Sequence, residues 1–358
     1  MYMVWSERYR IVPVTELMEG VTMHGFKASA AGGMDSGVVL NLNTGDTYLT
    51  NTDNGNFKIS ITSAGVLTGY IQSTANTNAI DCLTVTKIVG TNVKQLSDVP
   101  SYPTETDNYS LQAIFNSQGT LTFDKLKTVS FPVLSHIGKN ALAMTFQLCN
   151  ELTYAEFPEL TTIDTSGLYC AFRCTYGTPS LTTVSFPKLS SIGSNGMDYA
   201  FQGIKSLTGS LSFPALTSIS NYGIRFAFQN CTGLTSVSFP NLTSIGEYGM
   251  YYTFYRCTGL TSVSFPKLSS IGTSGMYGAF YQCTGLTSVS FPALTTSGVS
   301  ITSTSNSLDR CFYQCTGITE VHFPSAFSSY SSYLTKDVLF GGTSTSYCNA
   351  NLQILFDL

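Results

Sequence analysis

A 26-residue repeat occupies more than half of this chain of 358 residues. Leu234–Cys257 reads LTSVSFPNLTSIGEYGMYYTFYRC, and Leu260–Cys283 reads LTSVSFPKLSSIGTSGMYGAFYQC. Leu286 begins a further copy, LTSVSFPAL. A unit this short cannot bury its own apolar face, so each copy must pack on its neighbours. The sequence therefore predicts a solenoid, which offers an extended surface for binding rather than an enclosed pocket for chemistry.

A Phe-Pro pair marks each copy and gives the extent of the repeat. Successive pairs lie 26, 29, 27, 26, 26, 26 and 32 residues apart, so eight copies fill residues 126–325. Two of the longer intervals contain the extra segments Tyr176–Ser180 and Thr296–Leu308. Loops that project from a regular rod often carry functional contacts, although drift in a tolerant repeat produces them equally well.

The spacing of apolar residues changes within each copy. In the fifth copy Val237 and Phe239 stand two apart, the period of a strand with one buried face, and Pro240 ends the strand. The following intervals of three and four residues predict a bent turn and then a short helical or 3₁₀ segment. One strand and one helical or irregular side per coil is the plan of a leucine-rich repeat. The positions with the longer spacing are Leu242, Ile245, Met250 and Phe254.

The unit LTSVSFPxLTSIGxxGMxxxFxxCTG resembles the BspA-like class of bacterial leucine-rich repeats, which typically reads LTSITIPxxVTSIGxxAFxxC. The resemblance covers residues 126–325 and holds at the strand, at the TSIG corner and at the final Phe and Cys. This repeat is longer around Gly249-Met250, and no Asn occupies the usual ladder position. The resemblance implies an α/β solenoid with short parallel strands, in a secreted or cell-surface protein and often an adhesin.

The rest of the chain divides into four segments. Residues 21–100 contain apolar or alternating runs separated by turn signals such as Asn54-Gly55, which predicts a small all-β domain. We expect this domain to anchor the chain to a larger assembly. The other three segments are an N-terminal arm at 1–20, a linker and N-terminal cap at 101–125, and a C-terminal cap at 326–358.

Charged residues are sparse, at 11% of the chain, against roughly 25% in a typical globular protein. The net charge is −4, and the 17 Lys and Arg form no basic stripe. Nucleic acid is therefore not an expected partner. A surface whose solubility comes from Ser, Thr, Asn and Gly suits an extracellular or virion-exposed protein.

The sequence contains neither a membrane span nor a recognisable export signal. No run of 18 apolar residues is present, so membrane insertion is not expected. The first 20 residues lack the charged and then apolar pattern of a signal peptide. Either a signal has been removed, or the protein reaches the outside by another route, as a phage virion protein does when its host lyses.

Five of the ten cysteines stand three residues after the repeat Phe and are predicted to form a ladder inside the solenoid. Neighbouring rungs about 4.8 Å apart permit disulfides, but buried free thiols acting as small hydrophobes are the favoured interpretation. The cysteine spacing fits no zinc site, and the run NTDNGN at 51–56 fits a hairpin turn better than a calcium loop. We therefore expect no metal and no cofactor. The five are Cys149, Cys231, Cys257, Cys283 and Cys315.

Catalysis is not expected. The three histidines, His24, His136 and His322, lie far apart in the sequence, and no fingerprint of a hydrolase, metalloprotease or nucleotide-binding loop is present. Acidic residues form no close pair of the kind that glycosidases use.

Two sets of repeated side chains are candidate binding surfaces. A hydroxyl ladder follows the outward face of the strands, where Ser is also simply compatible with a β-surface. Tyrosine rows follow the predicted helical side, where stacked rings can pack on sugars or a protein partner, or can merely seal the coil edge. The first set is Ser236, Ser238, Ser262, Ser264, Ser288 and Ser290, and the second is Tyr251, Tyr255, Tyr277, Tyr281 and Tyr313.

The leading hypothesis is a non-enzymatic recognition or adhesion protein. We expect a phage virion appendage of tail-fibre or head-fibre type, attached through residues 1–100, that contacts bacterial surface glycan or protein. The alternatives are a BspA-like bacterial cell-surface adhesin and a structural decoration or spacer. A homo-oligomer is compatible with each of these hypotheses.

Overall fold

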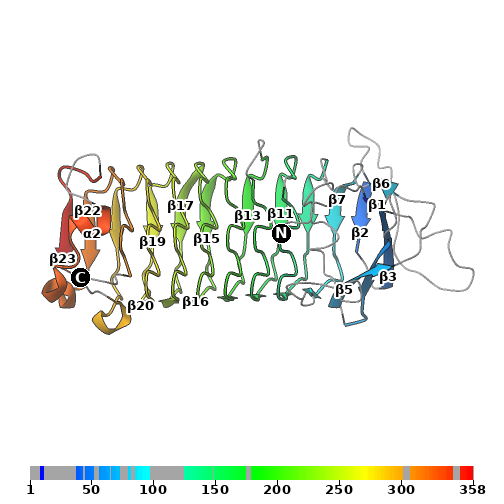
Figure 1. The fold of residues 1–358 in the computed structure, drawn as a ribbon, viewed down its shortest axis with the longest axis horizontal. Coiled ribbons are helices and arrows are strands. Elements are labelled where there is room, and N and C mark those ends of the chain that lie inside the picture. The colour runs from blue at the N-terminus through cyan, green and yellow to red at the C-terminus, as the bar shows by residue number, and fades with distance from the viewer. Residues whose placement is uncertain are drawn as a thin grey trace, which may run out of the picture.

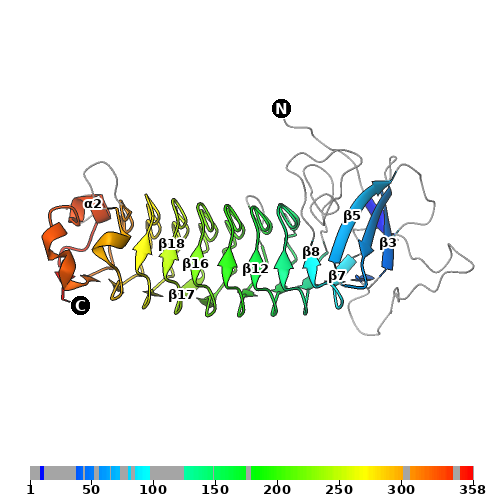
Figure 2. The same ribbon diagram turned by 90° about the horizontal axis from the view of Figure 1, so that it is seen from below.

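The described part of the chain forms an elongated rod of stacked coils (Figure 1). Seen from below, one set of strands, which includes β12, β16 and β18, faces the viewer, a second set, which includes β17, lies along the lower edge, and the connecting turns project upward (Figure 2). No helix in the described part is long and apolar enough to cross a membrane. The computed structural model describes residues 9–11, 38–42, 45–51, 56–64, 66–72, 80–81, 85–96, 125–147, 149–174, 179–300, 307–341 and 347–357.

Each regular coil carries two short strands, and each strand belongs to a separate parallel ladder. In the fifth copy the TSVS strand is β17 (Leu234–Ser238), and the strand at the TSIG corner is β18 (Ser244–Ile245). We call the two ladders the strand ladder and the corner ladder. β17 pairs in parallel with β19 (Ser262–Ser264), with Val237 opposite Val263. The parallel pairing of successive copies confirms the predicted solenoid.

The other strands of the repeat follow the same two ladders. The strand ladder is divided into three sheets, with breaks between β13 and β15 and between β19 and β21. It includes β9 (Thr128–Ser130), β11 (Tyr154–Glu156), β13 (Thr183–Ser185), β15 (Gly209–Ser212), β21 (Ser288–Ser290) and β22 (Glu320–Phe323). The corner ladder includes β10 (His136–Ile137), β12 (Thr162–Ile163), β14 (Ser191–Ile192), β16 (Ser218–Ile219) and β20 (Ser270–Ile271).

The third side of each coil, here called the turn face, is a run of turns rather than the expected helical segment. Alternate backbone N–H groups donate to the carbonyl of the residue three positions earlier in the same coil. The N–H groups between them donate to carbonyls of the next coil. Thus Ala279 N donates to Met276 O at 3.1 Å, whereas Phe280 N donates to Cys311 O at 2.9 Å. Every fourth residue has a positive φ, for example 50° at Ser274 and 59° at Gln282. Hydrogen bonds that a helix would close within itself therefore tie one coil to the next.

Two columns of phenylalanine rings run along the rod and form its core. The Phe239 and Phe265 rings stack at 5.3 Å, and the Phe265 and Phe291 rings at 5.9 Å, which confirms the predicted apolar spine. The second column meets the first edge-on, as at Phe239 and Phe254. The first column is Phe131, Phe157, Phe186, Phe213, Phe239, Phe265, Phe291, Phe323 and Phe356, and the second is Phe146, Phe172, Phe201, Phe228, Phe254, Phe280, Phe312 and Phe340.

The TSIG corner requires glycine because neighbouring coils approach closely there. A Cβ at Gly246 would lie 2.8 Å from the backbone nitrogen of Asn221 in the preceding coil. Without a Cβ, Gly246 N donates to Ile219 O at 2.8 Å. The glycine of the repeat thus permits the coil spacing that the corner ladder needs.

The N-terminal strands continue the two ladders, so a separate β-rich domain over residues 21–100 is not confirmed. β7 (Val85–Val89) pairs with β9, and β8 (Gln95–Leu96) pairs with β10. The predicted hairpin strands are present and join the corner ladder through β8. The remaining strands are β1 (Tyr9–Ile11), β2 (Val38–Asn41), β3 (Gly45–Asn51), β4 (Asn56–Ile61), β5 (Val66–Gln72) and β6 (Ile80–Asp81).

Several predicted segments fall partly or wholly outside the described residues. Of the arm at 1–20 only residues 9–11 are described, and of the segment at 101–125 only residue 125. Residues 176–178 of the first predicted insert and residues 301–306 of the second also lie outside the described residues. The second insert begins with a 3₁₀ turn, η3 (Thr296–Gly298).

The C-terminal segment packs against the last coil. It contains η4 (Ser325–Tyr330), α2 (Lys336–Phe340) and β23 (Gln353–Phe356), and β23 adds a parallel strand beside β22. Phe340 lies 5.7 Å from Phe312, ring to ring, so α2 covers the second phenylalanine column.

The repeat cysteines form a buried column of thiols. The Sγ atoms of Cys257, Cys283 and Cys315 each donate to the carbonyl of the repeat Phe in the preceding coil, at 3.1, 3.0 and 2.8 Å. Cys348 extends the column through a parallel bridge to Cys315. Burial raises the pKa of these thiols, and Cys257, Cys283 and Cys315 form no disulfide. The column therefore acts as a set of small hydrophobes with one weak donor each.

Removing one ring of the phenylalanine spine tests the stacking directly. We expect Phe265→Ala to lower the free energy of unfolding by about 3–5 kcal/mol, because the fully buried ring leaves a cavity in both columns. Ser262→Ala, on the exposed face of β19, should change it by less than about 0.5 kcal/mol. Urea unfolding of both variants measures the difference, and equal stabilities would contradict a continuous core.

Alkylation tests the state of the thiol column. We expect Cys257, Cys283 and Cys315 to resist iodoacetamide in the native protein, because burial excludes the reagent and suppresses the thiolate. The half-buried Cys174 should react first. Peptide mapping should show complete alkylation in guanidinium chloride without reductant. Cysteines that react only after reduction would instead reveal disulfides.

Candidate functional site

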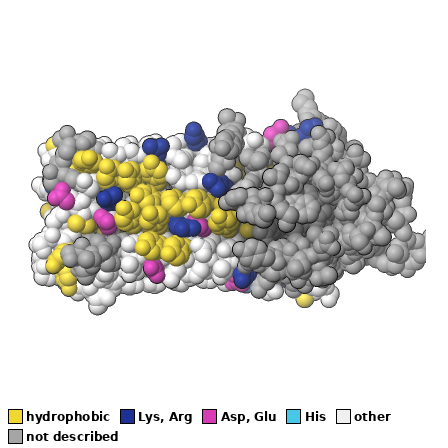
Figure 3. Space-filling view, in the orientation of Figure 1, with side chains coloured by type: hydrophobic (Ala, Val, Ile, Leu, Met, Phe, Trp, Pro, Cys, Tyr) yellow, Lys and Arg dark blue, Asp and Glu magenta, His cyan; other side chains and the backbone are white. Residues whose placement is uncertain are grey.

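The turn face carries a continuous band of hydrophobic side chains along the middle of the rod, yellow in Figure 3, and tyrosine rings in mutual contact form an aromatic surface within it. Tyr251 and Tyr277 stack at 5.2 Å, and Tyr281 and Tyr313 stack at 4.2 Å. Tyr255 meets Tyr281 edge-on at 5.0 Å, so the rows make contact without forming uniform columns. All five rings are half-buried. The structure thus brings the predicted tyrosine rows together on one face.

A further aromatic column, which the sequence analysis missed, runs between these rows. The Tyr199 and Phe226 rings stack at 4.7 Å, and the Phe226 and Tyr252 rings stack at 5.6 Å. The column was missed because its members change type from coil to coil and become Gly278 in the sixth copy. A Cβ at Gly278 would lie 2.7 Å from the Tyr252 ring, so the glycine makes room for that ring.

Several of these rings sit on strained backbone. Tyr248 and Tyr252 have φ values of 50° and 49°, and Tyr222 and Phe226 have 57° and 52°. The left-handed region is uncommon for bulky residues and costs roughly 1–2 kcal/mol each. It persists here because the hydrogen bonds between coils determine the backbone of every turn. The four-residue interval between these positions is the signal that could have revealed the column.

A buried ion pair lies at one end of the aromatic surface. Asp198 is fully buried and accepts two hydrogen bonds from Arg225, with Nη2–Oδ2 at 2.6 Å and Nε–Oδ1 at 3.1 Å. The Arg225 guanidinium lies 5.0 Å from the Tyr222 ring, and that of Arg173 lies 5.2 Å from the Tyr199 ring. Burial raises the pKa of Asp198 to about 6, although the Arg225 guanidinium acts in the opposite direction. The pair holds a cation among the aromatic rings.

A shallow polar groove of about 580 Å³ runs across five coils beside Tyr255, Tyr281 and Tyr313. The two residues that flank each repeat cysteine line it, so amide, guanidinium and threonine side chains recur from coil to coil. Arg256 Nε donates to Gln282 Oε1 at 2.7 Å, and Gln282 Nε2 donates to Gln314 Oε1 at 2.5 Å. The lining contains two cations and no carboxylate. Its members are Lys205, Asn230, Thr232, Arg256, Thr258, Gln282, Thr284, Gln314 and Thr316.

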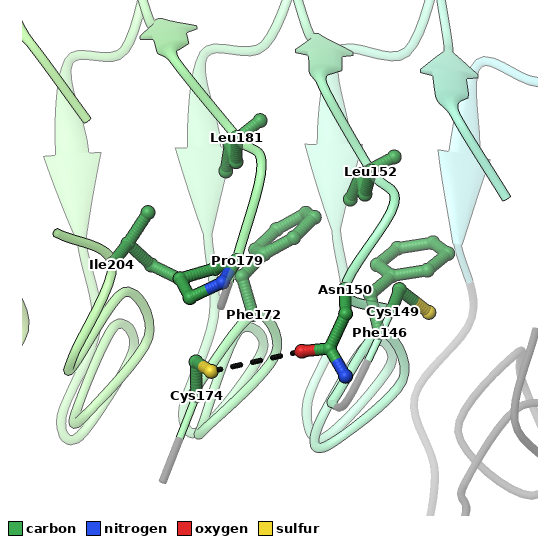
Figure 4. Close-up of a pocket in the computed structure, with 9 residues that line it drawn as sticks. All are labelled: Phe146, Cys149, Asn150, Leu152, Phe172, Cys174, Pro179, Leu181 and Ile204. Atoms are coloured by element: carbon green, nitrogen blue, oxygen red, sulfur yellow. Dashed lines mark hydrogen bonds between the residues drawn. The ribbon is translucent and has the colours of Figure 1, made fainter. Parts of the chain in front are cut away.

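A second, much smaller cavity lies between neighbouring coils of the first three copies (Figure 4). It measures about 10 Å³, which is enough for no more than one water molecule. Cys174 Sγ donates to Asn150 Oδ1 across its opening at 3.8 Å. The cavity is therefore too small for a ligand.

The strand ladder presents the predicted serine rows. Ser236 lies opposite Ser262, and Ser238 opposite Ser264, on the pleated outer surface. Ser236 Oγ donates to Ser210 Oγ at 2.6 Å. Ser288 and Ser290 occupy the equivalent positions of β21. These rows make a flat hydroxyl surface on a different side of the rod from the tyrosines.

His136 and His322 lie beside carboxylates in separate parts of the rod. His136 Nε2 lies 3.1 Å from Asp164 Oδ2, and His322 Nδ1 lies 3.0 Å from Asp357 Oδ1. The Asp357 carboxylate raises the pKa of His322. No group of three metal-ligating side chains occurs among the residues that the structure describes, and His24 lies outside them.

The buried carboxyl should make stability depend on pH in a defined direction. The pKa of Asp198 rises from 3.8 to about 6 on folding, so the folded protein binds this proton more tightly. We expect the free energy of unfolding of the wild type, relative to Asp198→Asn, to fall between about pH 4 and pH 6, by up to about 3 kcal/mol. It should then level off. Urea unfolding across this range measures the difference, and a rise with pH would contradict the assignment.

A family model agrees with this architecture. A BspA type leucine-rich repeat region matches in six copies, within residues 107–222, 171–298 and 197–340. No curated protein sequence matches. The crystal structure of the T. pallidum leucine-rich repeat protein TpLRR is similar at 19% identity and a TM-score of 0.37, covering 64% of this chain and 87% of that chain. Because the repeat matches extend over residues 107–340, well over half of the chain, the protein belongs to the family of BspA type leucine-rich repeat proteins.

Proposed function

We propose that this protein is a non-enzymatic recognition or adhesion protein whose turn face contacts a glycan or protein on a bacterial surface. The observation that carries this proposal is the continuous aromatic surface on that face, bordered by the polar groove. Rigid aromatic rings offer a large contact area at low cost in conformational entropy, and their hydroxyls remain available for hydrogen bonds. Leucine-rich repeats in general mediate interactions with other proteins, which supports a recognition role.

The turn face is a stronger candidate than the strand ladder. The serine rows are flat, and their small hydroxyls bury little area against a partner. The tyrosine rows combine apolar faces with polar rims, a composition that is enriched at binding interfaces. We therefore assign recognition to Tyr251, Tyr255, Tyr277, Tyr281 and Tyr313 rather than to the serines.

In this proposal the protein is a virion appendage of tail-fibre or head-fibre type, and residues 1–100 attach it to the larger assembly. The sparse charge and hydroxyl-rich surface support an exposed location. Immunogold labelling with an antibody to the solenoid tests the location. Labelled phage particles would support the appendage, whereas labelled bacterial cells without phage would indicate the cell-surface adhesin.

Replacing two adjacent tyrosines tests whether the turn face makes the proposed contact with bacteria. We expect the double variant Tyr255→Ala with Tyr281→Ala to bind target bacteria about 30-fold more weakly, the loss typical of removing hot-spot aromatics. The edge-on contact of the pair contributes about 1 kcal/mol beyond the area that the rings bury, and thermal unfolding checks that the variant stays folded. A cell-binding titration with fluorescently labelled protein measures the affinity.

Ser262→Arg provides the matched control on the opposite candidate surface, since it places a bulky side chain on the exposed face of β19. It should leave binding unchanged. If this variant loses binding while the tyrosine variant binds like wild type, the strand ladder is the contact surface. Wild-type binding by both variants would place the contact elsewhere on the protein, whereas no binding by the wild type itself would favour a spacer role.

A further inference from the structure

We propose that the groove along the tyrosine rows binds an extended acidic polysaccharide, whose carboxylates pair with Arg256 and Lys205 while its hydroxyls bond to the amide and threonine ladder. This inference rests on the proposed recognition function and names the ligand class for the same face. Four properties of the groove support it: its charge, its repetition, its backbone and the arrangement of Arg256.

The charge of the groove is opposite to that of the whole protein. The chain carries a net charge of −4, yet Lys205 and Arg256 are the charged residues of the lining. Cations near a groove attract anionic ligands and raise their association rate. Since the lining contains no carboxylate, an acidic chain would meet no repulsion within the groove.

The lining repeats with the coils. Each of four successive coils contributes one long polar side chain and one threonine, and neighbouring coils lie about 4.8 Å apart. A repeated surface of this kind matches a ligand whose own chemistry repeats along an extended chain. No apolar side chain lines the groove, whereas grooves that bind peptide helices present apolar pockets. Hydroxyl, amide and guanidinium groups beside aromatic rings instead match the hydroxyls, carboxylates and apolar ring faces of a sugar acid.

The backbone of the groove is strained at its long side chains. Asn230, Arg256, Gln282 and Gln314 have φ values of 62°, 59°, 59° and 56°. Asn and Gly adopt this region readily, whereas Arg and Gln do so at a cost. Hydrogen bonds between coils impose this conformation on every fourth residue of the turn face. At these four positions it sets the repeated placement of the side chains that line the groove.

Arg256 is held in place before any ligand arrives. Its Nε donates to Gln282 Oε1 at 2.7 Å, and its guanidinium carbon lies 5.0 Å from the Tyr255 ring centre. Fixing Nε leaves the arginine side chain with little conformational freedom to lose on binding. A guanidinium recognises a carboxylate through two parallel hydrogen bonds, which an ammonium cannot reproduce.

Calorimetric titration of the full chain tests the inference, with polygalacturonate as the acidic chain and its methyl ester as the neutral match. We expect the acid to bind and the ester to bind at least about tenfold more weakly, because the ester lacks the charge-assisted hydrogen bonds. Affinity for the acid should fall as salt is added. Equal affinity for the two polymers would overturn the inference.

Arg256→Gln is the decisive variant, because the next two coils already carry Gln at this φ. We expect it to bind polygalacturonate about tenfold more weakly and to keep wild-type thermal stability. Lys267→Gln removes the same charge outside the groove and should bind like wild type. Wild-type binding by Arg256→Gln, or equal loss in both variants, would overturn the proposed contact.

Polyglutamate and single-stranded oligodeoxythymidylate serve as acidic ligands of other classes. If either binds as tightly as polygalacturonate and loses affinity equally in Arg256→Gln, the groove recognises charge alone and the polysaccharide assignment fails. The wider proposal is tested separately. If the Tyr255 and Tyr281 double variant loses cell binding while Arg256→Gln keeps it, recognition by the turn face stands and the acidic ligand is wrong.

Discussion

Hydrogen bonds between successive coils hold this structure together on all three of its sides. They form the strand ladder at one side, the corner ladder at the second, and alternate with three-residue turns at the third. Every coil therefore satisfies its backbone only in the presence of its neighbours. The same one-coil step stacks the phenylalanine rings at 5.1–6.1 Å, so backbone pairing and core packing impose a single common spacing.

This spacing also creates the surface. Because each coil is displaced from the last along the rod, equivalent residues line up in columns, whatever their chemistry. Buried columns of Phe, Leu, Ile and Cys build the core, and outward columns of Ser, Tyr and amides build distinct faces. The residue type at one position of the repeat, when it recurs in every copy, therefore sets the chemistry of a whole row. A repeat protein acquires an extended ligand surface in this way without building a pocket.

The left-handed residues of the turn face connect backbone and function. They let alternate backbone N–H groups donate within their own coil and the N–H groups between them donate to the next coil, which a helix cannot do. At Gly278 the conformation is free of side-chain strain, but at Tyr252 and Arg256 it is not. Those two residues belong to the aromatic surface and to the polar groove. The same conformation recurs along the turn face at positions that build the core, such as the buried Cys170.

Part of this arrangement follows from the sequence alone. Strict 26-residue spacing of Phe239, Phe265 and Phe291 predicts stacked rings, because a short repeat has no other way to bury them. Alternation at Val237 and Phe239 predicts the strand ladder, and the position of Cys283 after Phe280 predicts the thiol column. The tyrosine rows were predictable for the same reason.

Three features depended on tertiary structure. The turn face follows from bonds between coils, which local spacing at Met250 and Phe254 cannot distinguish from a helical turn. The continuation of the ladders into β7 and β8 involves strands that lack the Phe-Pro pair, so no repeat signal identifies them. The groove combines residues 26 or more positions apart, such as Arg256 and Gln282. The 26-residue period of the sequence determines which residues stack in columns along the rod. Only the path of the chain within each coil determines which of these columns lie side by side.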